Sequence, residues 1–179
     1  IPATRYGVVS LHRFENIFDA ARFGALLDAL EQAAALLPLV FVLHPSTRRQ
    51  AERLGLMARL AAVPGLTLLP RMTYVPFLKL ASQACCVVTD GGSNQEELAF
   101  LGIPTLLMRR VTERGDGLGA TAELAGDNPQ ALVAFVRRPL QAPPPAPVDF
   151  TRAAGDGPAR QIAALLAAEF GSGSAQDRN

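Results

Sequence analysis

Residues 87–101 hold the residue types best suited to binding an anion, because a glycine-rich turn joins a short apolar run to a helix. Gly91 and Gly92 permit a tight turn with close backbone approach. Ser93 stands where the N-cap of the helix is expected, and Glu96, three residues later, completes a capping box. Free backbone N–H groups and the positive end of the helix dipole would then point at one spot. The pattern predicts a bound phosphate or diphosphate, or else a plain strand-to-helix connection.

A second polar cluster follows the first apolar run of the chain. Residues 6–11 are typical of a buried strand, and His12 and Arg13 come directly after it. His12 could donate to a phosphate or act as an acid, since imidazole titrates near neutrality, or it could bond a backbone carbonyl structurally. Arg13 could bind phosphate or form a local ion pair with Glu15. His44 follows a second predicted strand that lies farther from this point, so we expect a structural role for it.

Further side chains could contact the rest of a nucleotide. Two carboxylates beside a diphosphate would repel it, but the capping box gives Glu96 a structural role. Glu97 faces elsewhere and could accept hydrogen bonds from the two hydroxyls of a ribose, which a charged acceptor strengthens. Phe77, at the start of a predicted helix, could stack on a base or belong to the core. The loop at 109–119 carries arginines that could reach the same site or stay solvated.

The hydropathy pattern predicts strands alternating with helices. Such alternation produces a parallel sheet covered on both faces, and right-handed crossovers suggest the strand order 3-2-1-4-5-6. Strands one and four are then neighbours at the switch point, where ligands bind, so His12 and Gly92 should meet there. Strands are expected at 6–11, 39–43, 66–69, 85–89, 104–108 and 120–124, and helices at 19–37, 46–60, 74–83, 92–101, 128–138 and 158–170.

Composition is that of a folded domain. The chain has 179 residues, 49% of them hydrophobic and 18% charged, with a net charge of +1. This balance offers no argument for binding nucleic acid or a membrane surface, and no apolar run is long enough to span a bilayer. We expect a doubly wound, Rossmann-like α/β domain over residues 1–170 and a flexible tail at 171–179.

Cys85 and Cys86 are neighbours in a predicted strand, so their side chains should point to opposite faces. They therefore indicate reduced core residues rather than a disulfide or a metal site. A reducing, cytoplasmic location follows. We expect neither a metal nor a cofactor.

Several motifs occur in register along nearly the whole chain. Together they resemble the C-terminal domain of the UDP-N-acetylglucosamine 2-epimerase family. The motifs are His12-Arg13-Phe14-Glu15-Asn16, Thr89-Asp90-Gly91-Gly92-Ser93-Asn94-Gln95-Glu96-Glu97, Leu101-Gly102-Ile103-Pro104, Met108-Arg109, Thr112-Glu113-Arg114 and Gly155-Asp156-Gly157.

The resemblance implies a glycosyltransferase-B type fold, of which this chain is the C-terminal, UDP-holding half. Family members eliminate UDP from UDP-N-acetylglucosamine and add it back, which inverts carbon 2 and gives UDP-N-acetylmannosamine. A second branch hydrolyses the substrate, and we expect the non-hydrolysing reaction here. By likeness, Phe77 would flank uracil, Glu97 would bind ribose, and His12 with the 91–93 turn would meet the diphosphate. Arg114 would lie near the phosphates or the domain closure.

The resemblance also implies partners. The family's N-terminal domain contributes carboxylates to proton transfer at carbon 2, so we expect this chain alone to be inactive. The whole enzyme would be a homodimer in cell-envelope polysaccharide biosynthesis. The family usually has Ser-Gly-Gly after the aspartate, whereas this chain has Gly91-Gly92-Ser93, and Gly115-Asp116 replaces the family's Pro-Glu. Backbone N–H groups would then make the phosphate contact at position 91.

Three alternatives remain. The chain could be a stand-alone nucleotide-sugar-binding module, or part of another glycosyltransferase-B type enzyme that transfers a sugar from a UDP donor. The His-Arg-x-Glu-Asn cluster argues against a transferase. Binding of NAD is disfavoured, because no Gly-x-Gly-x-x-Gly follows the first strand.

Overall fold

The computed structural model describes residues 5–141 and residue 165 of the chain. The chain divides into two compact units, Ile1–Pro147 and Val148–Asn179, and the sheet lies within the first. The predicted helix at 158–170, Leu165 apart, and the predicted tail at 171–179 lie outside the described residues.

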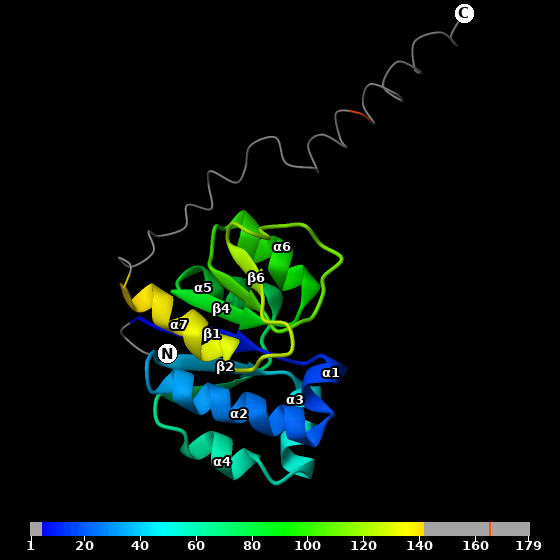
Figure 1. The fold of residues 1–179 in the computed structure, drawn as a ribbon, viewed down its shortest axis with the longest axis vertical. Coiled ribbons are helices and arrows are strands. Elements are labelled where there is room, and N and C mark those ends of the chain that lie inside the picture. The colour runs from blue at the N-terminus through cyan, green and yellow to red at the C-terminus, as the bar shows by residue number, and fades with distance from the viewer. Residues whose placement is uncertain (1–4, 142–164, 166–179) are drawn as a thin grey trace, which may run out of the picture. The chain divides into compact units, whose positions relative to one another are not determined.

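The first unit is built on a parallel sheet of six strands in the order β3-β2-β1-β4-β5-β6, as predicted (Figure 1). β1 pairs with β4 in the register Gly7↔Cys86 to Ser10↔Thr89, so both strands end at the same level. The residues that follow these strands therefore emerge side by side. The strands are β1 (Gly7–Ser10), β2 (Leu39–Leu43), β3 (Leu66–Pro70), β4 (Cys86–Thr89), β5 (Thr105–Leu107) and β6 (Ala122–Leu124).

Helices cover both faces of the sheet, which confirms the doubly wound arrangement. Among the described residues, no helix has the length and apolar character needed to cross a membrane. α2 and α7 pack against each other on one face (Figure 1). The helices are α1 (Phe14–Ile17), α2 (Ala20–Ala34), α3 (Pro45–Arg53), α4 (Met57–Ala62), α5 (Tyr74–Ser82), α6 (Gly92–Phe100) and α7 (Ala131–Gln141).

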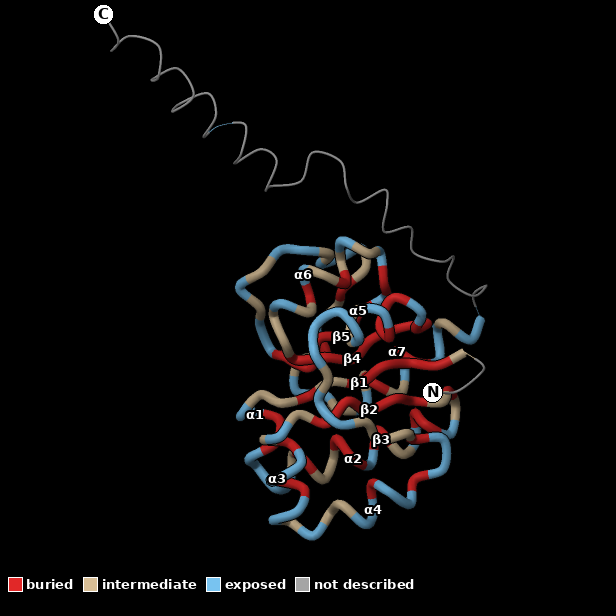
Figure 2. The backbone as a smooth tube through the Cα atoms, turned by 180° about the vertical axis from the view of Figure 1, so that it is seen from behind, coloured by how far each residue is buried: buried red, intermediate tan, exposed pale blue. Residues whose placement is uncertain are grey.

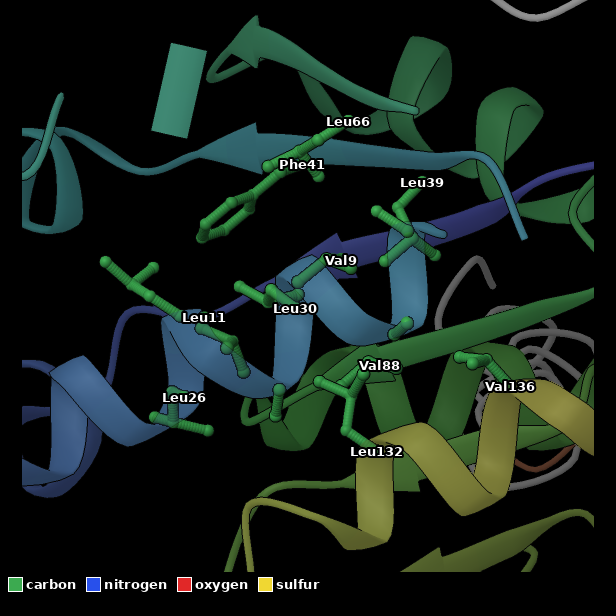
Figure 3. Packing of buried hydrophobic residues seen from close by; sticks show 14 of the residues in the cluster. Val9, Leu11, Leu26, Leu30, Leu39, Phe41, Leu66, Val88, Leu132 and Val136 are labelled. Atoms are coloured by element: carbon green, nitrogen blue, oxygen red, sulfur yellow. The ribbon is translucent and has the colours of Figure 1, made fainter. Parts of the chain in front are cut away.

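Alternate residues of the central strands divide the core into two layers. Val9, Phe41 and Val88 face the layer that contains α2 and α7 (Figure 3). Val8 and Val87 face the layer beneath α5 and α6. The period of two residues in a strand produces this division, and the strands are buried on both sides (Figure 2).

The two cysteines are free and buried, as predicted. The prediction that they point to opposite faces was wrong: both belong to the layer beneath α2 and α7, because Cys85 precedes β4 and does not follow its alternation. Burial raises the pKa of the Cys86 thiol to about 12. The thiol therefore stays protonated and unreactive at neutral pH.

Three predicted helices have different limits in the structure, and the one expected at 19–37 already ends at Ala34. The stretch expected as one helix at 46–60 is broken by Gly55, whose φ of +69° is incompatible with helix, so α3 and α4 are separate. The N-cap of α3 is His44 rather than Ser46, and Pro45 occupies the first turn. The third case is α7, which begins later than the predicted Asn128 and extends to Gln141.

Candidate functional site

A cavity of about 310 Å³ opens at the carboxyl ends of β1 to β4. Four of the residues singled out in the sequence line it together, namely His12, Phe77, Ser93 and Glu97. The glycine turn adjoins them, because a Cβ on Gly91 would lie 3.3 Å from His12 Cε1. The full lining is Ser10, His12, Val42, His44, Arg71, Met72, Tyr74, Phe77, Ser93, Asn94 and Glu97.

The glycine turn leads into α6 earlier than the predicted capping box allows. The N-cap is Gly91, with no side-chain cap, and Ser93 lies inside the first turn of the helix. The capping-box prediction was therefore wrong. The physical reason is Thr89, whose Oγ1 accepts hydrogen bonds from Gly91 N at 3.1 Å and from Asn94 Nδ2 at 3.0 Å. These bonds tighten the turn, so that the N-terminus of α6 faces the cavity.

Glu96 has a different partner from the one predicted. Its carboxylate pairs with Arg114, which comes from the loop after β5. Arg114 packs over Gly92, where a Cβ would lie 2.6 Å from Arg114 Nε. Gly92 therefore leaves room for the Arg114 side chain beside the first turn of α6.

Buried Gln95 holds this arginine loop in place. Its Nε2 donates to the carbonyl oxygens of Arg114 at 3.0 Å and Asp116 at 2.9 Å. Its Oε1 accepts from Thr112 Oγ1 at 2.8 Å. The loop is thus attached to α6, and Arg114 lies next to the helix N-terminus without itself lining the cavity.

Glu97 and Phe77 both line the cavity and are both partly buried. Burial raises the pKa of the Glu97 carboxyl above its usual range. Phe77 packs against the core layer beneath α5 and α6 while it also lines the cavity. The two readings of Phe77 in the sequence, as core aromatic and as base-stacking residue, are therefore compatible.

Arg13 lies apart from this group. Its Nε donates to Glu15 Oε1 at 2.6 Å, the local ion pair considered as the alternative. Its side chain lines a second cavity of about 410 Å³ together with Arg22, Arg109 and other residues. The structure therefore does not bring the Arg13 guanidinium together with the glycine turn.

His44 has the structural role that we expected, and it also lines the cavity. Its Nδ1 accepts a hydrogen bond from Ser46 N at 3.3 Å, which caps α3. Its ring centroid lies 5.1 Å from that of His12. Burial, followed by the positive charges of His12, Arg71 and Arg49, lowers the pKa of His44. The ring is therefore neutral at ordinary pH.

Sequence reasoning missed several residues of the site. Arg71 lies immediately after β3, so the rule that ligands bind beyond the carboxyl ends of strands could have found it. Tyr74 and Asn94 lie in the first turns of α5 and α6. Asp90, buried between β4 and the glycine turn, was visible in the sequence only as part of a motif.

Comparison with known proteins places this site in a family. The family profile described as UDP-N-acetylglucosamine 2-epimerase matches residues 1–167. The chain belongs to the UDP-N-acetylglucosamine 2-epimerase family. A member from Methanocaldococcus jannaschii, named UDP-N-acetylglucosamine 2-epimerase, is 28% identical over 134 residues. That match covers 73% of this chain and 37% of the relative, so the chain spans little more than a third of that protein.

A Pseudomonas aeruginosa family member, named UDP-2,3-diacetamido-2,3-dideoxy-D-glucuronate 2-epimerase, is 34% identical over 107 residues. This match covers 59% of the chain and 28% of the relative. The solved M. jannaschii UDP-GlcNAc 2-epimerase in complex with UDP-GlcNAc and UDP has a TM-score of 0.75 at 24% identity. The match covers 92% of this chain and 45% of that structure, so this chain has the fold of one half of a glycosyltransferase-B type structure.

Proposed function

We propose that this chain is the UDP-binding domain of a UDP-N-acetylglucosamine 2-epimerase, which interconverts UDP-N-acetylglucosamine and UDP-N-acetylmannosamine by elimination and re-addition of UDP. The observation that carries the proposal is the cavity at the switch point, where His12, Phe77, Ser93 and Glu97 meet beside the N-terminus of α6. The M. jannaschii and P. aeruginosa relatives are both named for UDP-linked substrates, so the uridine diphosphate is the part that their substrates share.

The proposed pose follows from the chemistry of the lining. The diphosphate lies at the α6 N-terminus, where backbone N–H groups and the helix dipole favour negative charge. His12 donates to it from one side and Arg114 from the other. Glu97 accepts from the ribose hydroxyls, and Phe77 flanks uracil. Arg13 would contact substrate only after leaving Glu15.

In this reaction UDP is the leaving group, so its diphosphate gains charge as the bond to the sugar breaks. Donors that are already in place stabilise that charge without reorganising. The backbone N–H groups at the N-terminus of α6 are donors of this kind, while the carboxylates for proton transfer at carbon 2 would come from an N-terminal domain. We therefore propose that the chain alone does not turn over. From the family resemblance, we also propose that the complete enzyme follows the non-hydrolysing branch.

Location and assembly are also part of the proposal. Two buried, free cysteines support a reducing, cytoplasmic setting. The homodimer and the role in cell-envelope polysaccharide biosynthesis rest on the family resemblance.

UDP is expected to bind this chain with a dissociation constant between micromolar and millimolar, roughly −4 to −8 kcal/mol. The reason is that one preformed site supplies donors for the phosphates and an acceptor for the ribose. Titration calorimetry with UDP, and with NAD as the control nucleotide, measures it. Tighter binding of NAD would contradict the assignment. The reaction is tested on the full-length enzyme by following deuterium uptake at carbon 2 of UDP-N-acetylglucosamine in heavy water.

Replacing Glu96 with Gln is expected to tighten UDP binding by up to about fivefold. The change removes a negative charge near the diphosphate and frees Arg114 from its exposed ion pair, and such a pair is worth roughly 0.2–1 kcal/mol. Calorimetry at low ionic strength measures the difference. Glu123→Gln is the matched control, because it frees Arg138 from a similar pair that lines neither cavity. Weaker binding by the Glu96 variant would mean that Glu96 orients Arg114 for the ligand.

A further inference from the structure

Asp90 is fully buried at the end of β4, and its carboxylate is surrounded by hydrogen-bond donors. The backbone N–H of His12 lies 3.0 Å from both carboxylate oxygens. Oδ2 also accepts from Arg13 N at 2.9 Å and from Asn16 Nδ2 at 2.9 Å. The carboxylate therefore ties the end of β4 to the start of α1, immediately beside the cavity.

Asn16 holds this carboxylate in a single position. Its Nδ2 donates to Met108 O at 2.8 Å as well as to Asp90, and its Oδ1 accepts from Arg22 Nε at 3.0 Å. Asn16 is itself fully buried. The segments that follow β1, β4 and β5, together with α2, thus fix where the charge of Asp90 lies.

The same carboxylate reaches the His12 ring. Asp90 Oδ1 lies 3.2 Å from His12 Nδ1. Within residues 5–141, no protein group makes a hydrogen bond to the other ring nitrogen, Nε2, and the ring lines the cavity. The ring nitrogen beside a carboxylate keeps its proton, because a bare lone pair on that nitrogen would face the negative charge of the carboxylate.

We propose that Asp90 is a positioning residue for His12, holding the proton on Nδ1 of the neutral ring so that Nε2 is presented to the cavity. A ring in this tautomer has its free lone pair on Nε2, so any further proton must bind there. Nε2–H becomes a donor aimed at an anion in the cavity. That the anion is the diphosphate of UDP rests on the proposed function, whereas the tautomer follows from the geometry alone.

Nitrogen-15 NMR of the untagged 179-residue chain tests the tautomer directly. The chain has two histidines, and His44 is a built-in contrast because its Nδ1 accepts a hydrogen bond and its proton must lie on Nε2. At about pH 9, well above the ordinary imidazole range, the two rings are expected to show opposite tautomers. A His44→Gln variant assigns the signals. A proton on Nε2 of His12 would overturn the proposal.

The Asp90→Asn variant separates positioning from a merely structural role. It should lose the Nδ1–H preference of His12 and bind UDP about tenfold more weakly, as for one lost charge-assisted hydrogen bond. Uridine, which has no phosphate, should bind as well as before. Asp28→Asn is the matched control, since Asp28 pairs with Arg59 in an exposed ion pair outside both cavities.

The outcomes are distinct. Equal losses for UDP and uridine in the Asp90 variant would mean that Asp90 only maintains the fold, which overturns the proposal. If that variant does not fold, the tautomer of His12 in the unchanged chain decides. If UDP fails to bind the unchanged chain while His12 carries its proton on Nδ1, the proposed function fails and the positioning stands.

Discussion

A Glu97→Gln variant is expected to bind UDP at least about tenfold more weakly than the unchanged chain, because hydrogen bonds to a charged group are worth roughly 1.5–3 kcal/mol. Glu97 lines the cavity, and in the proposed pose it accepts from both ribose hydroxyls. A neutral amide oxygen accepts more weakly, and the NH₂ group of glutamine cannot accept at all. Titration calorimetry with UDP measures the loss.

An analogue of UDP without the ribose hydroxyls distinguishes this role from a general effect. Its affinity should fall much less than that of UDP when Glu97 is replaced. Equal losses for both ligands would remove Glu97 from the ribose. Glu52→Gln is the matched control, because Glu52 is an exposed glutamate on α3 that does not line the cavity.

The Glu97→Gln variant should also be more stable than the unchanged chain when no UDP is present. Burial raises the pKa of Glu97 in the folded state, so the folded chain binds this proton more tightly than the unfolded chain. The free energy of unfolding therefore falls as pH rises through the raised pKa, and the penalty disappears below the unfolded value of about 4.3. Urea unfolding should show a gain for Glu97→Gln at neutral pH that shrinks towards about pH 4. A site that favours ligand at the expense of stability would behave in this way.

Replacing Gly65 with Ala is expected to lower the free energy of unfolding by about 2–4 kcal/mol, which is a large part of the stability of an ordinary domain. Gly65 lies in the turn before β3 with a φ of +80°. A Cβ there would lie 2.6 Å from the carbonyl oxygen of Ala34, and this is backbone that cannot rotate away. Gly65 O also accepts from Leu39 N at 2.8 Å, so strain would reach the start of β2.

Gly24→Ala is the matched control for this prediction, with the opposite expected sign. Gly24 lies inside α2, and a Cβ there would meet nothing within 4 Å. Alanine in a helix interior is more favourable than glycine by about 0.5–1 kcal/mol, so this variant should be more stable. Urea unfolding measures both changes. A neutral Gly65→Ala substitution would show that the turn adopts another conformation in solution.

The strand order and the position of the cavity could be predicted without coordinates. Buried apolar runs alternate with amphipathic helices, and right-handed crossovers leave few ways to arrange them. That reasoning brought His12 and the glycine turn together, and Phe77 and Glu97 line the same cavity. Helix limits were less accurate, because Gly55 and the Thr89 hydroxyl each alter the backbone through local interactions that a hydropathy pattern does not describe.

The backbone framework of this domain thus follows from the hydropathy pattern of the sequence and from the right-handedness of the strand crossovers. Both act over the whole length of each element, so they tolerate local irregularity. The partners of the charged groups were settled only in three dimensions. Arg114 meets Glu96, and Asp90 lies beside His12. The structure also decided between the two partners that the sequence offered for Arg13, in favour of Glu15. Hydrogen bonds and ion pairs act over about 3 Å, so they depend on where loops from distant parts of the chain come to rest, and residue type and spacing do not specify those paths.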